Sequence, residues 1–230
     1  MKAKELTEDE KYLQQLISQG EGLNLDFKFA ISDSRKIARS IVAFANAKGG
    51  KLLIAVKDNG VVAGIRSDEE IYMIDTALLM FCKPHIETKQ KVLNYLGKEV
   101  LEVKVSKQSG ERLCTVKEEN GRDMVYVRMK DSNQLVNRIW LRTWARKKSK
   151  KPAITKLNDS ELIFLRLMSD MKMRSLDEIS QKTKLKKRLV ENFIIKFGVL
   201  DLIKINFTSA GVLYSHSDKF ENFELENYKE

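Results

Sequence analysis

The sequence has few of the residues that build cysteine and histidine sites. Its 230 residues include only 2 cysteines and 2 histidines. Cys82 and Cys114 stand alone, outside any Cys-x-x-Cys pattern, which argues against a disulfide framework and against a structural zinc site. His85 and His216 lie far apart in the sequence, which removes most histidine-based metal and nucleophilic mechanisms. Any catalysis would therefore have to depend on carboxylates and lysines.

Proline, glycine and long apolar runs are also scarce. The chain has 2 prolines, 11 glycines and 43% hydrophobic residues. This composition predicts packed globular structure, because a disordered chain lacks the apolar surface that offsets its loss of conformational entropy. No apolar run approaches the roughly 18 residues needed to cross a bilayer, and the charged start lacks the apolar segment of a signal peptide. We therefore expect a cytoplasmic protein without a membrane partner.

Basic residues are in excess and are unevenly distributed. Lys and Arg outnumber Asp and Glu by 42 to 32, a net charge of +10 that favours a polyanionic partner. Residues 138–151 contain seven basic residues and no acid, and residues 182–188 contain five more, whereas residues 218–230 form an acidic tail. One such run usually marks only a solvated surface, but two in a chain of this length favour nucleic acid.

The first part of the chain predicts an α+β domain with a mixed sheet and helices. In the first strand apolar and polar residues alternate, so Leu25 should face a core while Asp26 lies on the opposite, polar face. Trp140 and Trp144 should pack in a core or between domains rather than stack on bases. Helices are expected at residues 7–20, 33–46, 71–81 and 133–148, and strands at 23–29, 52–56, 86–92, 100–105 and 125–129.

The second part of the chain has the element order of a winged helix. A charged run ending in Pro152 predicts a linker. Beyond it, helices are expected from residue 158 to 170, from residue 175, and from residue 184 to 197, followed by a hairpin that turns at Ala210-Gly211. The predicted organisation is a domain at 1–146, a basic linker at 147–156, a winged helix at 157–217 and an acidic tail at 218–230.

An ordered set of motifs in the first part resembles the Schlafen AlbA-like domain family. The motifs are Leu25-Asp26-Phe27-Lys28, Ala43-Phe44-Ala45-Asn46 followed by Gly49-Gly50, the strand and turn from Leu52 to Gly60, Gly64-Ile65, and Tyr126-Val127-Arg128. The resemblance covers roughly residues 6–145. It implies nucleic-acid binding, and in vertebrate Schlafens it implies a metal-dependent endoribonuclease that acts on structured RNA.

The resemblance also implies a candidate catalytic and metal site. The related nucleases use three carboxylates, and the matching positions are Glu21, Asp26 and Asp58. Such a trio could bind Mg²⁺ or Mn²⁺ through oxygen ligands and position a water, with Lys28 or Lys57 offsetting the developing charge. Two departures count against this role: Asp26 is one methylene shorter than the family's glutamate, and the chain has one copy of a domain that those nucleases duplicate. The same carboxylates also suit a turn, a loop and a polar strand face.

The third helix of the winged helix, residues 184–197, is the predicted recognition helix, because its basic residues lie mostly off its apolar stripe. A winged helix that binds protein instead is the alternative for this domain. Together with the first basic run, this helix supplies the candidate nucleic-acid-binding residues, which are Arg142, Arg146, Lys147, Lys148, Lys184, Lys186, Lys187, Arg188 and Asn192.

We therefore expect a DNA-binding transcriptional regulator rather than an enzyme, in which both domains contact DNA or structured RNA and the chain forms a homodimer. Binding itself should require no cofactor. The alternative is an endoribonuclease that uses the carboxylate trio with Mg²⁺ or Mn²⁺. The sequence has no Gly-x-x-x-x-Gly-Lys-Ser/Thr stretch, so nucleotide hydrolysis is not expected.

Overall fold

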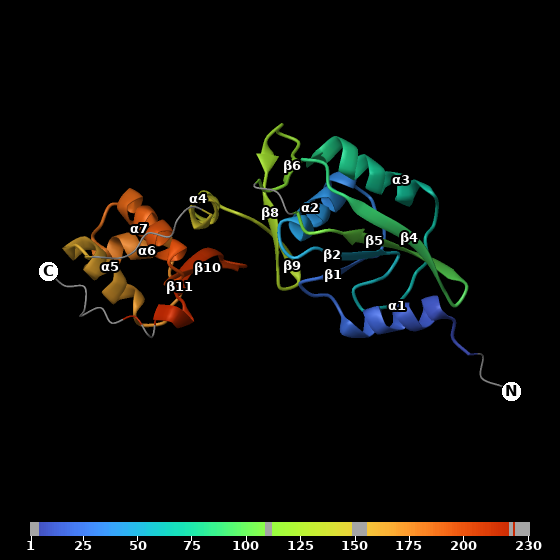
Figure 1. Ribbon diagram of the computed structural model, residues 1–230, viewed down its shortest axis with the longest axis horizontal. Helices are drawn as coiled ribbons and strands as arrows, with labels where there is room; N and C mark the ends of the chain where they lie inside the picture. The colour runs from blue at the N-terminus through green and yellow to red at the C-terminus, as the bar shows by residue number, and fades with distance from the viewer. Residues whose placement is uncertain (1–4, 109–111, 149–155, 221–222, 224–230) are drawn as a thin grey trace. The chain divides into compact units, whose positions relative to one another are not determined.

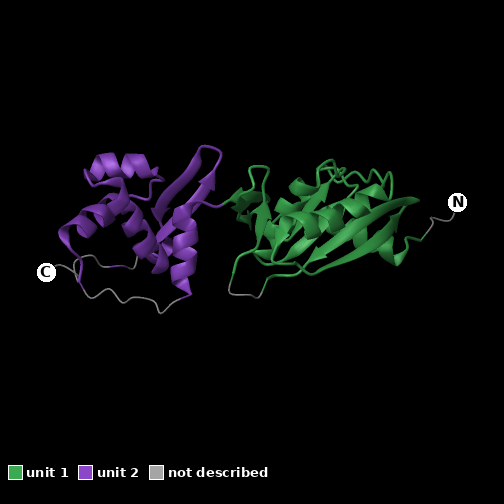
Figure 2. Ribbon diagram, turned by 90° about the horizontal axis from the view of Figure 1, so that it is seen from above, with its two compact units in different colours: residues 1–135 green, residues 136–230 purple. Residues whose placement is uncertain are grey.

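The computed structural model describes residues 5–108, 112–148, 156–220 and 223. The chain divides into two compact units, residues 1–135 and 136–230 (Figure 2). This division differs from the boundary expected at residue 146, because helix α4 (Arg138–Lys147) packs against α7 (Lys187–Val199) and contributes Ile139 to the core of the second unit. Most of the predicted linker and of the predicted acidic tail lies outside the described residues.

The first unit is built on a four-stranded mixed sheet, in agreement with the predicted α+β fold. Its strands stand in the order β1-β2-β5-β4, where β1 and β2 are parallel and the other pairs are antiparallel. A smaller sheet has the order β3-β6-β7, and β8 pairs with β9. The elements are α1 (Glu8–Gln19), β1 (Leu25–Lys28), α2 (Ser34–Ala45), β2 (Gly50–Ile54), α3 (Glu69–Thr76), the π-helical turn η1 (Ala77–Phe81), β3 (Cys82–Lys83), β4 (Thr88–Tyr95), β5 (Lys98–Val105), β6 (Thr115–Lys117), β7 (Asp123–Met124), β8 (Tyr126–Met129) and β9 (Ser132–Leu135).

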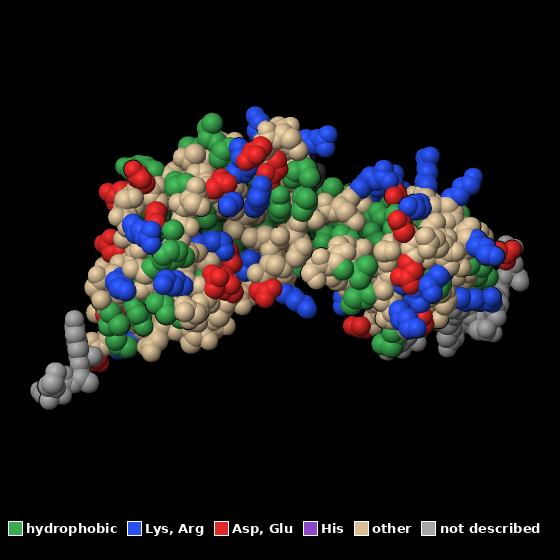
Figure 3. All heavy atoms as spheres, turned by 180° about the vertical axis from the view of Figure 1, so that it is seen from behind, with side chains coloured by type: hydrophobic (Ala, Val, Ile, Leu, Met, Phe, Trp, Pro, Cys, Tyr) green, Lys and Arg blue, Asp and Glu red, His purple; other side chains and the backbone are tan. Residues whose placement is uncertain are grey.

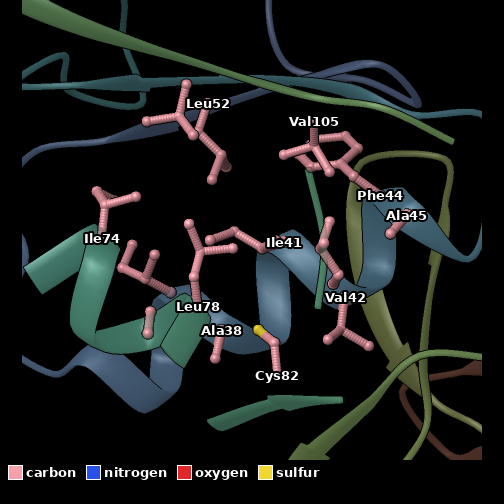
Figure 4. Close-up of a cluster of buried hydrophobic side chains, with 14 of the residues drawn as sticks. Ala38, Ile41, Val42, Phe44, Ala45, Leu52, Ile74, Leu78, Cys82 and Val105 are labelled. Atoms are coloured by element: carbon pink, nitrogen blue, oxygen red, sulfur yellow. The ribbon is translucent and has the colours of Figure 1, made fainter. Parts of the chain in front are cut away.

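Helices cover both faces of the main sheet (Figure 1). On one face, Leu13 and Leu16 of α1 pack with Leu25, Phe27 and other apolar residues of the strands. On the other face, α2 and α3 form the larger core, in which every drawn side chain is buried (Figure 4). The sheet therefore has two covered faces, and the polar face predicted for β1 is not exposed: Asp26 is only 3% exposed.

The motif Ala-Phe-Ala-Asn at the end of α2 has a structural role. Phe44 is fully buried, and the Asn46 amide joins α2 to two later segments. Its Nδ2 donates to the carbonyl oxygens of Cys114 and Tyr126, at 2.9 and 2.8 Å, while its Oδ1 accepts from the Cys114 amide at 2.7 Å. One side chain thus satisfies three backbone groups that lie about 70 to 80 residues away in the sequence.

The helix predicted from residue 133 begins later than expected. Residues 132–135 form β9, which pairs antiparallel with β8 from Tyr126↔Leu135 to Met129↔Ser132. Helix α4 starts after Asn137, whose side chain accepts a hydrogen bond from the Trp140 amide at 2.8 Å. A side-chain cap of this kind fixes a helix start, so the cap at Asn137 and the strand pairing before it override the apparent helical pattern.

The second unit contains helices α5 (Asp159–Met168), α6 (Leu176–Thr183) and α7, followed by the antiparallel hairpin β10 (Ile203–Thr208) and β11 (Gly211–His216). This is the predicted order of three helices and a hairpin. Phe164, Phe193 and Phe197 pack together at its centre, with ring centroids 5.7 to 6.3 Å apart. Within the described residues, no helix is long and apolar enough to cross a membrane.

Helix α7 differs at both ends from the predicted span of residues 184–197. Lys184 adopts a left-handed conformation with φ of 58° as the C-cap of α6, and Lys186 is the N-cap of α7. At the other end, Gly198 lies inside the helix, where a Cβ atom would come within 3.1 Å of the Thr143 Cγ2 atom of α4. Glycine at this position therefore lets α4 and α7 lie close together.

Gly50→Ala should destabilise the first unit. An added Cβ would lie 2.4 Å from Cδ1 of Phe44, and this ring is fully buried and cannot move aside. We expect the free energy of unfolding to fall by about 1–3 kcal/mol, measured by urea denaturation followed by circular dichroism. Gly22→Ala is the matched control, because a Cβ there meets nothing within 4 Å. Equal losses in both variants would contradict this account.

Candidate nucleic-acid interface

The buried Asp26 forms an ion pair with an arginine that comes from near the C-terminal end of the first unit. Arg128 of β8 places Nη2 3.1 Å from Oδ1 of Asp26 and also donates to the carbonyl oxygens of Gly22 and Leu25. Its Nη1 donates to Asn133 at 3.0 Å. Both charged side chains are almost fully buried and have lost their contacts with water. Each therefore needs the opposite charge of the other to compensate this loss.

Glu21 lies beside this pair, within hydrogen-bonding distance of Asp26. Its Oε1 accepts a hydrogen bond from the Phe27 amide at 2.8 Å. Partial burial raises the pKa of the Glu21 carboxyl, and hydrogen bonding with Asp26 raises this pKa further. The Lys28 ammonium lies 2.6 Å from Oδ2 of Asp26. Two cations therefore already compensate the charge of Asp26.

Asp58 does not join the other two carboxylates in a metal-binding group. It is exposed, in the turn that follows β2. Across the part of the chain that the structure describes, no three His, Cys, Asp or Glu side chains gather closely enough to hold a metal ion. The catalytic roles of Glu21, Asp26, Asp58 and Lys28, and a requirement for Mg²⁺ or Mn²⁺, remain predictions.

The second unit brings arginines from two helices to one hollow, which we call the arginine hollow. It has a volume of about 700 Å³ and is lined by Arg138, Leu141 and Arg142 of α4 and by Arg188 and Glu191 of α7. Arg138 pairs with Glu191 at 2.6 Å. The two basic runs of the sequence thus meet at one surface, and Arg142 and Arg188 are both exposed there.

The remaining candidates in the second unit lie at different places. Lys184, Lys186, Lys187 and Asn192 are exposed near or on α7, and Lys187 pairs with Asp177 at 2.7 Å. Arg146, Lys147 and Lys148 are exposed at the end of α4. Lys147 is bonded to Asp201, and the Lys148 ammonium lies 4.2 Å from the centroid of the Trp144 ring. Arg146, Lys147 and Lys148 therefore do not form one basic surface, because at least two of them already contact other side chains.

The first unit has a basic hollow that the sequence did not reveal, and we call it the lysine hollow. Its volume is about 330 Å³, and none of its lining residues is acidic. Lys51 is engaged, because it donates to the Tyr12 hydroxyl at 2.7 Å, whereas the other three lysines are exposed. The lining residues are Asn24, Lys48, Gly49, Gly50, Lys51, Lys104, Val105, Ser106 and Lys107.

The lysine hollow escaped prediction because it is assembled from segments that are distant in sequence. Lys48 and Lys51 flank Gly49-Gly50 at the start of β2, while Lys104 lies in β5 and Lys107 follows it. Antiparallel pairing of these strands places Lys51 opposite Lys104. On the face that Figure 3 shows, Lys and Arg side chains project from both units and are interspersed with acidic residues. An acid-free group of lysines is therefore a local feature.

Comparison with known proteins places the first unit among related sequences. A family model described as Schlafen, AlbA_2 matches residues 21–137, about half of the chain. The match begins at Glu21 and includes Asp26, Arg128 and the lysine hollow. No curated protein matches the sequence.

Several solved structures are similar to the chain at low identity. A structural-genomics protein from Corynebacterium diphtheriae has a TM-score of 0.42 and 14% identity, over 70% of this chain and 39% of its own length. The N-terminal domain of a RecG-related protein from Nitrosomonas europaea has a TM-score of 0.35 and 20% identity, over 44% and 74%. BpsR of Bordetella bronchiseptica, a protein described as binding DNA, has a TM-score of 0.27 and 19% identity, over 37% and 62%.

Glu21→Gln should stabilise the protein at neutral pH. Because the folded-state pKa of Glu21 is raised, the folded chain holds this proton more tightly than the unfolded chain does, so stability falls as pH rises from about 4.3 through the folded pKa. A glutamine does not ionise, so the variant does not lose stability in this way as pH rises. It also keeps a side-chain oxygen that can accept a hydrogen bond from the Phe27 amide. Its melting temperature should exceed that of the wild type at pH 7, and the two should converge below pH 4.

Titration with Mg²⁺ or Mn²⁺ separates this account from a role in metal binding. If Glu21 were a metal ligand, millimolar metal would raise the melting temperature of the wild type and leave that of Glu21→Gln unchanged. A variant less stable than the wild type at pH 7 would contradict the predicted pH dependence.

Proposed function

The chain belongs to the Schlafen AlbA_2 family, as its ordered motifs predicted, and we propose that it binds nucleic acid through basic surfaces on both of its units. The observation that carries the proposal is the lysine hollow. No acidic residue lines it, and Lys48, Lys104 and Lys107 are exposed there, so it favours a phosphate whose negative charge each of these ammonium groups can approach. The fourth lysine, Lys51, is already paired with Glu102 at 3.6 Å. The hollow also lies within the residues that match the family.

The second unit supports the proposal through a different geometry. Helices α5, α6 and α7 and the hairpin have the order of a winged helix, in which the third helix enters the major groove. On α7, Arg188 and Asn192 are exposed, and Arg142 of α4 lies beside Arg188 at the arginine hollow. In this proposal α7 contacts base edges, while the arginines and neighbouring lysines contact the phosphates on either side.

From this geometry we propose a DNA-binding transcriptional regulator that acts as a homodimer and needs no cofactor for binding. Duplex DNA suits α7, because the major groove of B-form DNA admits a helix whereas that of A-form RNA is too narrow. A dimer would set two copies of α7 against two half-sites and would gain affinity through the linkage. We do not propose a ribonuclease as a second function, because Arg128 and Lys28 already engage Asp26.

Removal of the lysines should weaken binding and reduce its dependence on salt. We expect Lys48→Ala/Lys104→Ala/Lys107→Ala to lower the magnitude of the slope of log K against log salt by up to about 3, because each lost phosphate contact removes roughly one released counterion. Fluorescence anisotropy with labelled duplex DNA at several salt concentrations measures this slope. A triple alanine variant of Lys186, Lys187 and Arg188 tests the second unit in the same way.

Lys36→Ala/Lys83→Ala/Lys117→Ala is the matched control. It removes the same charge from exposed lysines that lie in neither hollow. If the control weakened binding as much as the other two variants, net charge rather than the two surfaces would explain the affinity. A salt-independent affinity of the wild type would overturn the proposal, and a preference for structured RNA over duplex DNA would overturn the assignment of DNA.

The full chain should form a dimer at micromolar concentration. Sedimentation velocity over a range of protein concentrations measures this association, and addition of a DNA with two half-sites should shift it toward the dimer. A chain that stays monomeric at high micromolar concentration, with and without such DNA, would contradict the homodimer.

A further inference from the structure

Both tryptophans of the chain line one pocket in the second unit, and we call it the tryptophan pocket. Its volume is about 370 Å³, within the usual range of small-molecule sites. Trp140, Thr143, Trp144 and Lys147 come from one face of α4, and the rest of the lining comes from the end of α7 through β10 and the residue after β11. Those other lining residues are Gly198, Asp201, Ile203, Lys204, Ile205 and Ser217.

The tryptophans line the pocket instead of filling the core. Both are half-buried, and neither belongs to the buried cluster of the unit, in contrast to the predicted role in a core. Indoles four residues apart on a helix lie on the same side, one turn from each other. Gly198 packs closely on Thr143 beside them, so α4 and α7 meet at the edge of the pocket.

The rim of the pocket has an available positive charge. Asp201 is bonded to Lys147 and lies 3.0 Å from the ammonium of Lys219, so its charge is already compensated. Lys204 of β10 is exposed, and among the described residues no carboxylate lies within ion-pair distance of its ammonium. The pocket therefore combines aromatic walls with one cation, Lys204, that no carboxylate of the described residues pairs with.

We infer that the tryptophan pocket binds a small planar aromatic anion. The ring would lie against the indoles, which favour offset or edge-to-face contact with another ring. The anionic group would receive a charge-assisted hydrogen bond from Lys204. Aliphatic anions would lose the aromatic contacts, and neutral aromatic compounds would lose the ionic one.

Occupancy of the pocket should alter nucleic-acid binding, and this part of the inference rests on the proposed function. Helix α4 contributes to two hollows through opposite faces: Trp140 and Trp144 line the tryptophan pocket, while Arg138 and Arg142 line the arginine hollow. A ligand wedged between α4 and β10 would shift α4 relative to α7. Because Arg142 and Arg188 lie on these two helices, the shift would separate them and weaken binding to phosphates.

Two isosteric probes test the binding step. In ¹H–¹⁵N spectra of the full chain the two indole N–H signals report directly on the pocket. 2-Naphthoate should shift both signals, whereas 2-naphthamide, which lacks the charge, should bind about threefold or more weakly. Lys204→Ala should remove this difference, and Lys172→Ala, at an exposed lysine outside the pocket, should preserve it.

Three outcomes would overturn the assignment. The first is an absence of indole shifts at millimolar naphthoate. The second is equal affinity for both probes in the wild type, which would mean that the pocket takes any aromatic ring. The third is a shift caused by a single-stranded oligonucleotide but not by naphthoate, which would make the pocket a stacking site for an unpaired base.

Affinity for duplex DNA tests the coupling step. With the pocket saturated by naphthoate, the dissociation constant of the wild type for DNA should rise at least about threefold, and in Lys204→Ala the same rise should need about threefold or more naphthoate. If the indole signals show a filled pocket in the wild type and its dissociation constant for DNA does not change, the coupling is overturned. Failure of the protein to bind any nucleic acid would overturn the proposed function, and the indole shifts would still decide the pocket.

Discussion

The ion pair between Arg128 and Asp26 is the interaction on which the architecture of the first unit depends. One guanidinium connects β8 with β1 and with the loop before it, and it lies 5.0 Å from the centroid of the Phe44 ring of α2. Removal of one partner from a buried pair of this kind typically costs about 3–5 kcal/mol, because the other charge stays buried without compensation. β8 is thus held at one point to β1 and α2, two elements that are far from it in sequence.

This arrangement gives the family motifs a structural meaning. The motif around Asp26 and the motif ending in Arg128 meet in the ion pair, and Asn46 of the Ala-Phe-Ala-Asn motif bonds to the backbone of Cys114 and Tyr126. Gly50 leaves room for the Phe44 ring. The residues of these motifs therefore form the framework of the unit, and the proposed contacts with nucleic acid lie in lysines on its surface.

Local features could be predicted from the sequence and distant ones could not. The helix expected from residue 7 does begin there, at a capping box of Thr7 and Glu10, because such interactions span only three or four residues. By contrast, Asp26 and Arg128 are 102 residues apart, so alternation along β1 predicted an exposed Asp26. The lysine hollow could not be predicted for the same reason, since it is strand pairing that brings Lys51 and Lys104 together. In the second unit both basic runs were visible, but their meeting at α4 and α7 depended on the glycine at position 198.

The two open edges of the main sheet are both protected by positive charge. At the β1 edge, Arg128 donates a hydrogen bond to the carbonyl oxygen of Leu25. At the β4 edge, Lys89 and Lys91 are exposed. An unprotected edge offers its backbone groups to a strand of another molecule and promotes aggregation, whereas charged side chains there oppose such pairing. The sheet can therefore stay open without extending from one molecule to the next, and any specific association of two chains would have to use a surface other than these strands.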